Sequence, residues 1–368
     1  MERKWSVLSL GAVLACTVLA GCLPVELSVS PKGEFIIPRQ EGYVLLDPGK
    51  GEAKIVLAAK GNKPAFAVFA PDGNDFAAVT KTDGDFKVSR VARDGTAKEV
   101  LTASNMTYLR WSPDGKTISI TRIGDTQNEA VKENLPELIV VSADGGAKKT
   151  LLGGCSMIHR WTSDSKSILA VKITGKVKDK DRYVGELALI SAEDGKATPI
   201  AAVVSEKKMF VDLSPDGKKA LLVATKLGKA GSKLESADEK PQLFEVNLAD
   251  GTFRSVREGV LYGMYSPKGT KVLLAAGGDG GLQLDVCDAA FQKSVTVASD
   301  AAKTAGSGPD NADIYPGWVN DDIVHYLRER AVYGVQGKNL QLMMVGADGK
   351  NPLNLQPTID MSLKDAAK

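Results

Sequence analysis

Residues that could carry out chemistry are sparse in this chain of 368 residues. Its two histidines, His159 and His325, lie far apart, and no pair of cysteines or histidines has the spacing of zinc ligands. A nucleophile elbow of the form Gly-x-Ser-x-Gly is also absent. We therefore predict no metal site, no cofactor and no catalytic set, and we interpret both histidines as packed or hydrogen-bonded structural residues.

One stretch, SPDGKT at residues 112–117, ends like a phosphate-binding loop. Such a loop needs a glycine five positions before its Gly-Lys-Thr, so that consecutive backbone N–H groups can surround a phosphate. Arg110 occupies that position, so the phosphate-binding interpretation fails. The residues suit a turn between two strands instead, because Pro113 presets its own φ and Gly115 accepts a positive φ.

This turn occurs seven times along the chain, at spacings that lengthen from 40 to 53 residues. A second turn, most often Asp-Gly, follows every copy but the sixth, and Asp-Gly between alternating apolar runs is a strong hairpin signal. A bulky apolar residue stands immediately before each copy, which indicates a repeated packing role. These residues are Val29, Phe69, Trp111, Trp161, Leu213, Tyr265 and Trp318.

Each repeat divides into four strands, so the sequence predicts an all-β fold, a β-propeller of seven four-stranded antiparallel blades. One small twisted sheet cannot bury both of its faces, whereas sheets arranged in a ring bury each face against a neighbour. The aromatic-Ser-Pro-Asp-Gly-Lys pattern followed by an apolar strand resembles the repeat of TolB-like and WD-type propellers.

That resemblance implies three features of the architecture. The Pro-Asp-Gly turn joins the innermost strand of a blade to the second strand. A single propeller domain spans residues 25–358, from an inner strand to an outer one, and the ring closes without a shared strand. Residues 359–368 then form a C-terminal tail.

The N-terminus begins with a charged segment, MERK, and continues with an apolar run from Trp5 to Ala20. A membrane span needs about 20 apolar residues, so this run suits a secretory signal better. It ends in Leu-Ala-Gly-Cys at residues 19–22, which resembles the signal box of bacterial lipoproteins. The resemblance implies that residues 1–21 are a lipoprotein signal peptide that is cleaved, and that the thiol of Cys22 carries the lipid.

Lipidation of Cys22 has consequences for the location of the protein. Residues 22–24 leave a very short tether, so we expect the propeller to lie close against a membrane, held by two or three acyl chains. Leu23 after the cysteine, in place of aspartate, resembles the outer-membrane sorting choice. We therefore predict a lipid-anchored protein of the bacterial cell envelope, with the outer membrane favoured and its periplasmic or surface side left open.

The position before the bulky residue of each inner strand is expected to border the central channel. Three successive units have a charged residue there, namely Arg110, Arg160 and Asp212. These residues could line the channel as a polar binding site. Alternatively, Arg160 and Asp212 could neutralise each other, because burial of an unpaired charge is costly.

The connections between the second and third strands are long and polar in units three, four and five. Adjacent blades bring them together on one face, where they form either a solvated rim or a partner-binding surface. Tyr183 is their only aromatic residue and is the predicted contact anchor. The candidate partner-binding residues are Glu129, Lys132, Glu133, Lys178, Asp179, Arg182, Tyr183, Lys229, Lys233 and Glu235.

The formal net charge of +2 gives no electrostatic case for nucleic-acid binding. Cys155 and Cys287 fall on distant blades, so buried free thiols are expected in place of a disulfide. Our hypothesis is a monomeric, non-catalytic scaffold that binds an envelope protein of unknown identity. One alternative is a lactonase or small hydrolase that uses channel residues. The other is a carbohydrate or small-ligand binder that exposes Tyr108, Tyr262 or Tyr315 at the channel mouth.

Overall fold

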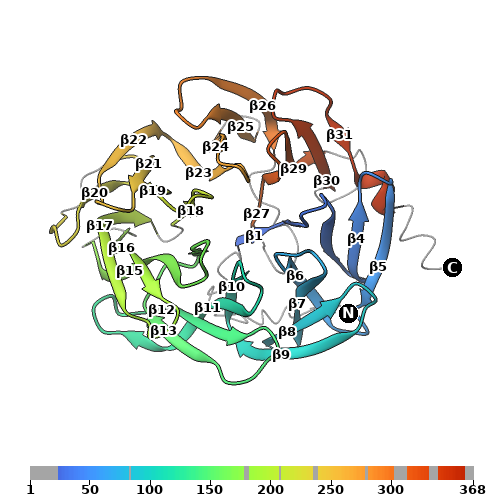
Figure 1. Cartoon of the computed structure of the whole chain (residues 1–368), viewed down its shortest axis with the longest axis horizontal. Coiled ribbons are helices and arrows are strands. Elements are labelled where there is room, and N and C mark those ends of the chain that lie inside the picture. Colours follow the sequence, from blue (N-terminus) through green and yellow to red (C-terminus); the bar gives the residue numbers. More distant parts are fainter. Residues whose placement is uncertain are drawn as a thin grey trace, which may run out of the picture.

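The computed structural model describes residues 24–82, 84–177, 182–206, 209–234, 239–277, 281–301, 313–330 and 339–360. These residues form a ring of small β-sheets, and the fold is a TolB-like β-propeller, as the repeats predict (Figure 1). Seven blades follow one another in chain order, and the innermost strand of each blade comes first. Within the described ranges, no helix is both long enough and apolar enough to cross a membrane.

The first four blades contain strands β2 to β17 and β20, and all neighbouring strands within them are antiparallel. Blade 1 comprises β2 (Ser28–Val29), β3 (Phe35–Arg39), β4 (Gly42–Asp47) and β5 (Glu52–Ala58), and blade 2 comprises β6 (Lys63–Phe69), β7 (Asp75–Thr82), β8 (Asp85–Ala92) and β9 (Ala97–Ser104). Blade 3 comprises β10 (Met106–Trp111), β11 (Thr117–Asn128), β12 (Glu133–Ser142) and β13 (Lys149–Gly153). Blade 4 comprises β14 (Arg160–Trp161), β15 (Ser167–Lys176), β16 (Arg182–Ser191) and β17 (Ala197–Glu206), and it has a fifth strand, β20 (Lys226–Lys229).

The last three blades complete the ring. Blade 5 comprises β18 (Val211–Leu213), β19 (Lys219–Ala224), β21 (Gln242–Asn247) and β22 (Phe253–Glu258). Blade 6 comprises β23 (Val260–Tyr265), β24 (Lys271–Gly277), β25 (Leu282–Asp288) and β26 (Ser294–Ala301). Blade 7 comprises β28 (Gly317–Asn320), β29 (Ile323–Arg330), β30 (Asn339–Gly346) and β31 (Leu353–Asn354). Blades 6 and 7 are joined by one backbone pair, Ala301 with Arg328.

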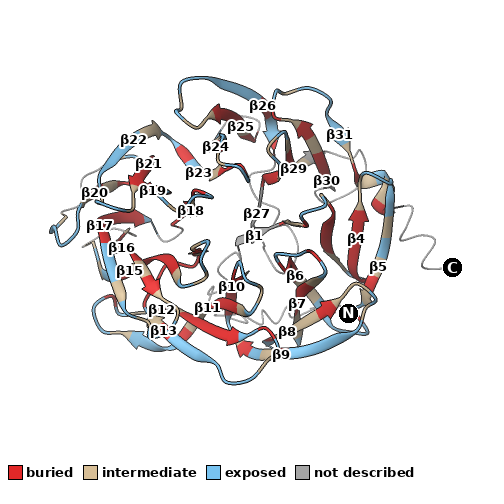
Figure 2. Ribbon diagram, viewed as in Figure 1, coloured by how far each residue is buried: buried red, intermediate tan, exposed pale blue. Residues whose placement is uncertain are grey.

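The antiparallel order gives the ring two different faces. Every inner strand runs toward the turn that joins it to the second strand, so all seven of these turns lie on one face, which we call the turn face. The connections between second and third strands lie on the opposite face, which we call the hairpin face. In Figure 2 the buried residues concentrate in the inner and middle strands, and the exposed residues lie along the outer strands and loops.

The bulky residue before each turn joins its blade to the preceding blade. The indole Nε1 of Trp111 in blade 3 donates a hydrogen bond to the Val68 carbonyl of blade 2 at 3.0 Å, and Trp318 in blade 7 donates to the Met264 carbonyl of blade 6 at 3.1 Å. Both tryptophans are buried, so each provides apolar area as well as a satisfied donor. The repeated aromatic position therefore serves packing between blades.

The first and last described segments lie where blade 7 contacts blade 1. Strand β1 (Pro24–Glu26) pairs in parallel with β27 (Asp313–Tyr315), and both lie near the centre of the ring (Figure 1). A short helical turn at residues 356–360 places Ile359 in one apolar cluster with Phe35 of blade 1 and Leu342 of blade 7. Ile359, which the sequence assigns to the tail, is completely buried. Among the described residues, blades 1 and 7 share no strand, so ring closure uses side-chain packing and the β1–β27 pair.

Replacement of Ile359 by alanine tests this closure. We expect Ile359→Ala to lower the free energy of unfolding by about 2–5 kcal/mol, because it leaves a cavity between the first and last blades. Urea unfolding followed by tryptophan fluorescence measures the change. Leu261→Ala is the matched control, since the Leu261 side chain is 51% exposed and its loss should have little effect. Equal effects of the two substitutions would show that the C-terminal turn does not help to close the ring.

Candidate functional site

Three inner strands bring charged side chains together at the centre of the ring. Arg160 on β14 donates from Nε to Asp212 Oδ1 on β18 at 2.8 Å. The second carboxylate oxygen of Asp212 accepts the backbone N–H of Tyr265 in blade 6 at 2.9 Å. The predicted pairing of Arg160 with Asp212 is therefore present, and the pair also links three consecutive blades.

Tyr108 on β10 connects this pair to the remaining charged residue, Arg110. The Tyr108 hydroxyl accepts hydrogen bonds from Arg110 Nε, at 2.7 Å, and from Arg160. The centroid of its ring lies 5.2 Å from Arg110 Cζ and 5.9 Å from Arg160 Cζ, within cation–π range of both guanidinium groups. Burial, and then the like charge of Arg160, lowers the pKa of Arg110 well below its usual range. The three predicted residues thus form one cluster, held by a tyrosine.

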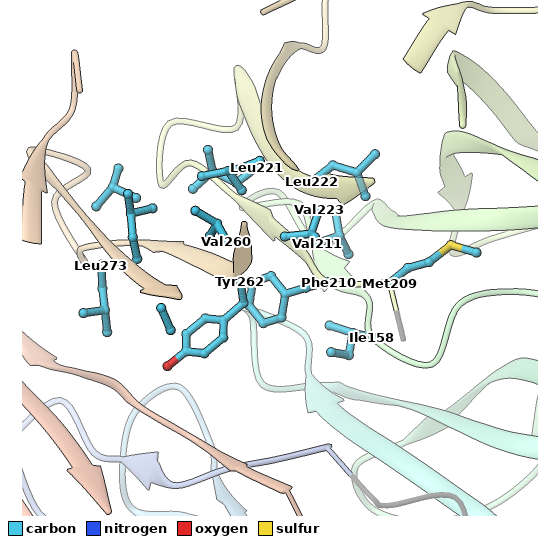
Figure 3. Packing of buried hydrophobic residues seen from close by; sticks show 14 of the residues in the cluster. Ile158, Met209, Phe210, Val211, Leu221, Leu222, Val223, Val260, Tyr262 and Leu273 are labelled. Atoms are coloured by element: carbon cyan, nitrogen blue, oxygen red, sulfur yellow. The ribbon is translucent and has the colours of Figure 1, made fainter. Parts of the chain in front are cut away.

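Aromatic residues proposed as ligand contacts are packed inside the protein. Tyr108 is 3% exposed and Tyr262 is 1% exposed. Figure 3 shows Tyr262 beside Phe210 among aliphatic side chains, and the two ring centroids are 5.2 Å apart. The side chain of Tyr315 lies outside the described residues. Tyr108 and Tyr262 therefore contribute to packing, which leaves the carbohydrate-binding alternative without its exposed aromatic platform at these two positions.

Both histidines have the structural roles predicted from the sequence. His159 Nε2 lies 2.7 Å from Ser119 Oγ, and His325 packs edge-on against Phe35 at 5.4 Å between ring centroids. Burial is the main cause that lowers the pKa of each imidazole to about 3, so both are neutral at pH 7. Among the described residues, no group of three histidine, cysteine, aspartate or glutamate side chains could hold a metal ion.

The two cysteines of the described blades are free and buried, as predicted. Burial raises the pKa of Cys155 above its usual range and that of Cys287 to about 11. Both thiols are therefore protonated at neutral pH and poorly reactive.

A cavity of about 580 Å³ lies on the turn face, beside Arg110 of the charged cluster. Turns and inner strands of blades 1, 2, 6 and 7 form its wall, and Arg110 contributes from blade 3. Most of the wall is apolar, and three rigid prolines from separate turns stand at its rim. The main lining residues are Pro31, Pro71, Pro267, Met264, Trp318 and His325. Sequence reasoning did not find this cavity, because its residues come from five separate repeats.

The long loops predicted in units three to five each contain strand residues. In unit three, β11 and β12 extend the hairpin until only residues 129–132 remain as a turn. In unit five the connection begins with β20, which pairs with the outer strand β17 of blade 4. Polar side chains concealed these strands in the sequence, because on an extended hairpin only every second residue needs to be buried. In the unit-three connection, Val131 and Leu135 have their side chains buried.

The prediction that Tyr183 is an exposed contact anchor is wrong. Tyr183 is completely buried, and its hydroxyl lies 2.7 Å from Glu133 Oε2 in the neighbouring blade. Lys176 pairs with the same carboxylate and lies 5.6 Å from the Tyr183 ring centroid. Strand alternation directs Tyr183 toward the apolar cluster that contains Leu135, so Tyr183 joins two hairpins to each other.

The other candidate hairpin residues have mixed positions. Glu129 and Lys132 are exposed and pair with each other at 2.7 Å, and Arg182 donates to the Glu239 carbonyl of the blade 5 connection at 3.1 Å. The hairpins of blades 3, 4 and 5 do lie together, since these contacts link them. Lys229 and Lys233 are exposed. Four predicted residues lie outside the described residues, namely Cys22, Lys178, Asp179 and Glu235.

No protein-family model matches the chain. No curated protein matches it either. Solved structures do match, at identities that show the fold alone. TolB from Acinetobacter baumannii is 15% identical, with a TM-score of 0.52 over 87% of this chain and 78% of that one. An oligogalacturonate lyase in complex with manganese is 14% identical, with a TM-score of 0.63 over 87% and 88%.

A third similar structure bears on ring closure. The β-propeller domain of the Trilobed protease from Pyrococcus furiosus, described as having an open velcro topology, is 16% identical. Its TM-score is 0.56 over 88% of this chain and 95% of that one. The matching structures thus include both a TolB protein and enzymes, so the fold by itself does not decide between binding and catalysis.

The contribution of the central ion pair can be measured by removing its carboxylate charge. We expect Asp212→Asn to lower the free energy of unfolding by about 3–5 kcal/mol, because the buried Arg160 loses its counter-charge. Urea unfolding at pH 7 measures the loss. Glu129→Gln breaks the exposed pair with Lys132 and should change stability little. An Asp212→Asn protein as stable as this control would refute the structural role of the pair.

The buried histidines predict a dependence of stability on pH. The folded pKa of each, about 3, lies below the usual value of 6.5, so the unfolded chain takes up protons first as the pH falls. Their contribution is complete above pH 6.5 and is lost between pH 6.5 and 3, at about 1.4 kcal/mol per histidine per pH unit. Comparison of urea unfolding between pH 7 and 5 should show a shallower dependence for His325→Gln than for wild type. An unchanged slope would mean that His325 is not neutral and buried.

Proposed function

We propose that this protein is a lipid-anchored, non-catalytic propeller of the bacterial envelope, and that it binds a protein partner at the turn face. One observation carries the proposal. The polar groups at the centre of the ring bond to one another, whereas the cavity beside them is open and walled mostly by proline and apolar side chains. An arrangement of this kind suits the burial of an apolar group from a partner.

Membrane anchoring is supported by the sequence at the N-terminus. The Leu-Ala-Gly-Cys box ends at Cys22, and the first strand of the structure begins at Pro24, only two residues later. A cleaved and lipidated chain would therefore consist of the lipid, a minimal tether and the propeller. The similarity to TolB concerns the fold and is compatible with this location.

The hydrolase alternative is less well supported by the geometry. A catalytic arginine would need to present its guanidinium to a substrate, but Arg160 faces Asp212 at 2.8 Å and also donates to Tyr108. The Asp212 carboxylate in turn accepts the Tyr265 N–H. Turnover of a lactone that is lost in Arg160→Ala, with the fold intact, would favour the enzyme and defeat the scaffold proposal.

In-cell crosslinking tests the proposed partner surface. We expect a tagged wild-type protein, crosslinked in intact cells of its own bacterium, to recover an envelope protein from the membrane fraction. Met264→Trp narrows the cavity and should reduce that recovery by about tenfold, the effect of losing roughly 1.4 kcal/mol of binding. Ala130→Trp adds the same side chain to the exposed hairpin turn of blade 3 and is the matched control.

Three results would contradict this proposal. Equal recovery with Met264→Trp and wild type would remove the turn-face cavity from partner binding. A loss confined to Ala130→Trp would move the partner to the hairpin face. Membrane association that persists in Cys22→Ser would refute the lipid anchor, because the serine hydroxyl cannot carry the thioether-linked lipid.

A further inference from the structure

The first strand of the protein enters the ring from the hairpin face. β1 is separated from the inner strand β2 by a single residue, Leu27, and β27 is separated from the inner strand β28 by Pro316. Because every inner strand runs toward the turn face, the segments that lead into β2 and β28 lie on the opposite side. β27 also packs beside the second strand β29, which runs toward the hairpin face.

The centre of the ring therefore has different structures on its hairpin side and on its turn side. On the hairpin side, β1 and β27 form a parallel pair in the middle of the ring (Figure 1), and β1 also approaches β10 of blade 3. On the turn side lies the open cavity of about 580 Å³. The N-terminal end of β1, at Pro24, is consequently held near the axis of the ring, on the side away from the cavity.

Covalent geometry limits how far Pro24 can be from the proposed anchor. An extended chain spans at most about 3.6 Å per residue, so Pro24 lies within roughly 7 Å of the Cα atom of Cys22. A tether of this length at the axis does not let the ring stand on its edge, which would need extra chain as long as the ring's radius. It also does not reach around the ring to the turn face.

We infer that the hairpin face lies flat against the lipid bilayer and that the turn-face cavity points away from the membrane. This inference rests on the proposed lipid anchor and specifies how that anchor orients the binding surface. Any partner of the cavity must then approach from the aqueous side. The hairpins of blades 3 and 4, whose strands are among the longest in the ring, are the parts closest to the lipid headgroups.

Three ion pairs of opposite sign lie on the described part of the hairpin face, and they add no net charge to it. The pairs are Glu129 with Lys132, Glu133 with Lys176, and Lys226 with Glu239. The hairpin turn of blade 3 also carries no exposed large apolar residue that would insert into the acyl region. The tether imposes contact with the bilayer in this arrangement, and we expect that contact to persist in vesicles without anionic lipid.

Fluorescence quenching on vesicles tests this orientation. The full lipidated protein is reconstituted into vesicles of phosphatidylethanolamine and phosphatidylcholine that contain a headgroup-nitroxide lipid. One variant, Ala130→Cys, places a bimane fluorophore at the hairpin turn of blade 3, and its matched control, Lys116→Cys, places it on the turn face of the same blade. The native Cys155 and Cys287 are buried with raised pKa values, so they should remain unlabelled.

The expected result is quenching at least about threefold stronger at position 130 than at position 116, because nitroxide quenching requires near contact with the headgroups. A second variant inserts twenty glycine and serine residues between Cys22 and Pro24, a linker with a mean span of about 25 Å, which should abolish the difference. Flotation of the vesicles separates the possible failures. Protein that floats but is quenched equally at both positions, or more at 116, overturns the orientation and leaves the anchor intact. Protein that does not float overturns the anchor and, with it, the proposed function.

Discussion

Each blade of this protein can bury its faces only against the blades on either side, so the whole structure depends on closing the ring. The repeated residue before each turn meets this need locally, since Trp111 and Trp318 extend across to the carbonyl groups of the preceding blades. Closure uses a different arrangement where blade 7 meets blade 1. There the structure has the parallel pair of β1 and β27 and the buried Ile359.

The same constraint explains the chemistry at the centre of the ring. Charges that point inward lose contact with water, and their burial is tolerated when each one is paired and hydrogen-bonded. Arg160 joins this arrangement across three blades, because it pairs with Asp212 and donates a hydrogen bond to the Tyr108 hydroxyl. In the function that we propose, these paired groups hold the blades together and the cavity on the turn face receives the partner.

Closure of the ring has a further effect on the proposed anchor. The strand that completes the centre of the ring, β1, begins two residues after the cysteine of the signal box. The β1–β27 pair, which stabilises the fold, thereby determines where a membrane tether would emerge. In the orientation that we infer, the hairpins that the sequence marked as a partner surface lie nearest the lipid, with Glu129 paired to Lys132 and Tyr183 buried between the hairpins of blades 3 and 4.

The sequence alone determined the fold, because turn residues at a fixed phase and alternating apolar residues are local signals that recur in every blade. It also anticipated the Arg160–Asp212 pair, since unpaired charges at successive inner positions would be costly. Other features depend on contacts between neighbouring repeats that lie about 50 residues apart in the chain, and no local pattern records them. Such contacts buried Tyr183, made Tyr108 the link between two arginines, and added β20 to blade 4. Only the tertiary structure decided the position of the cavity and of Pro24, because both arise where segments from opposite ends of the chain meet at one axis.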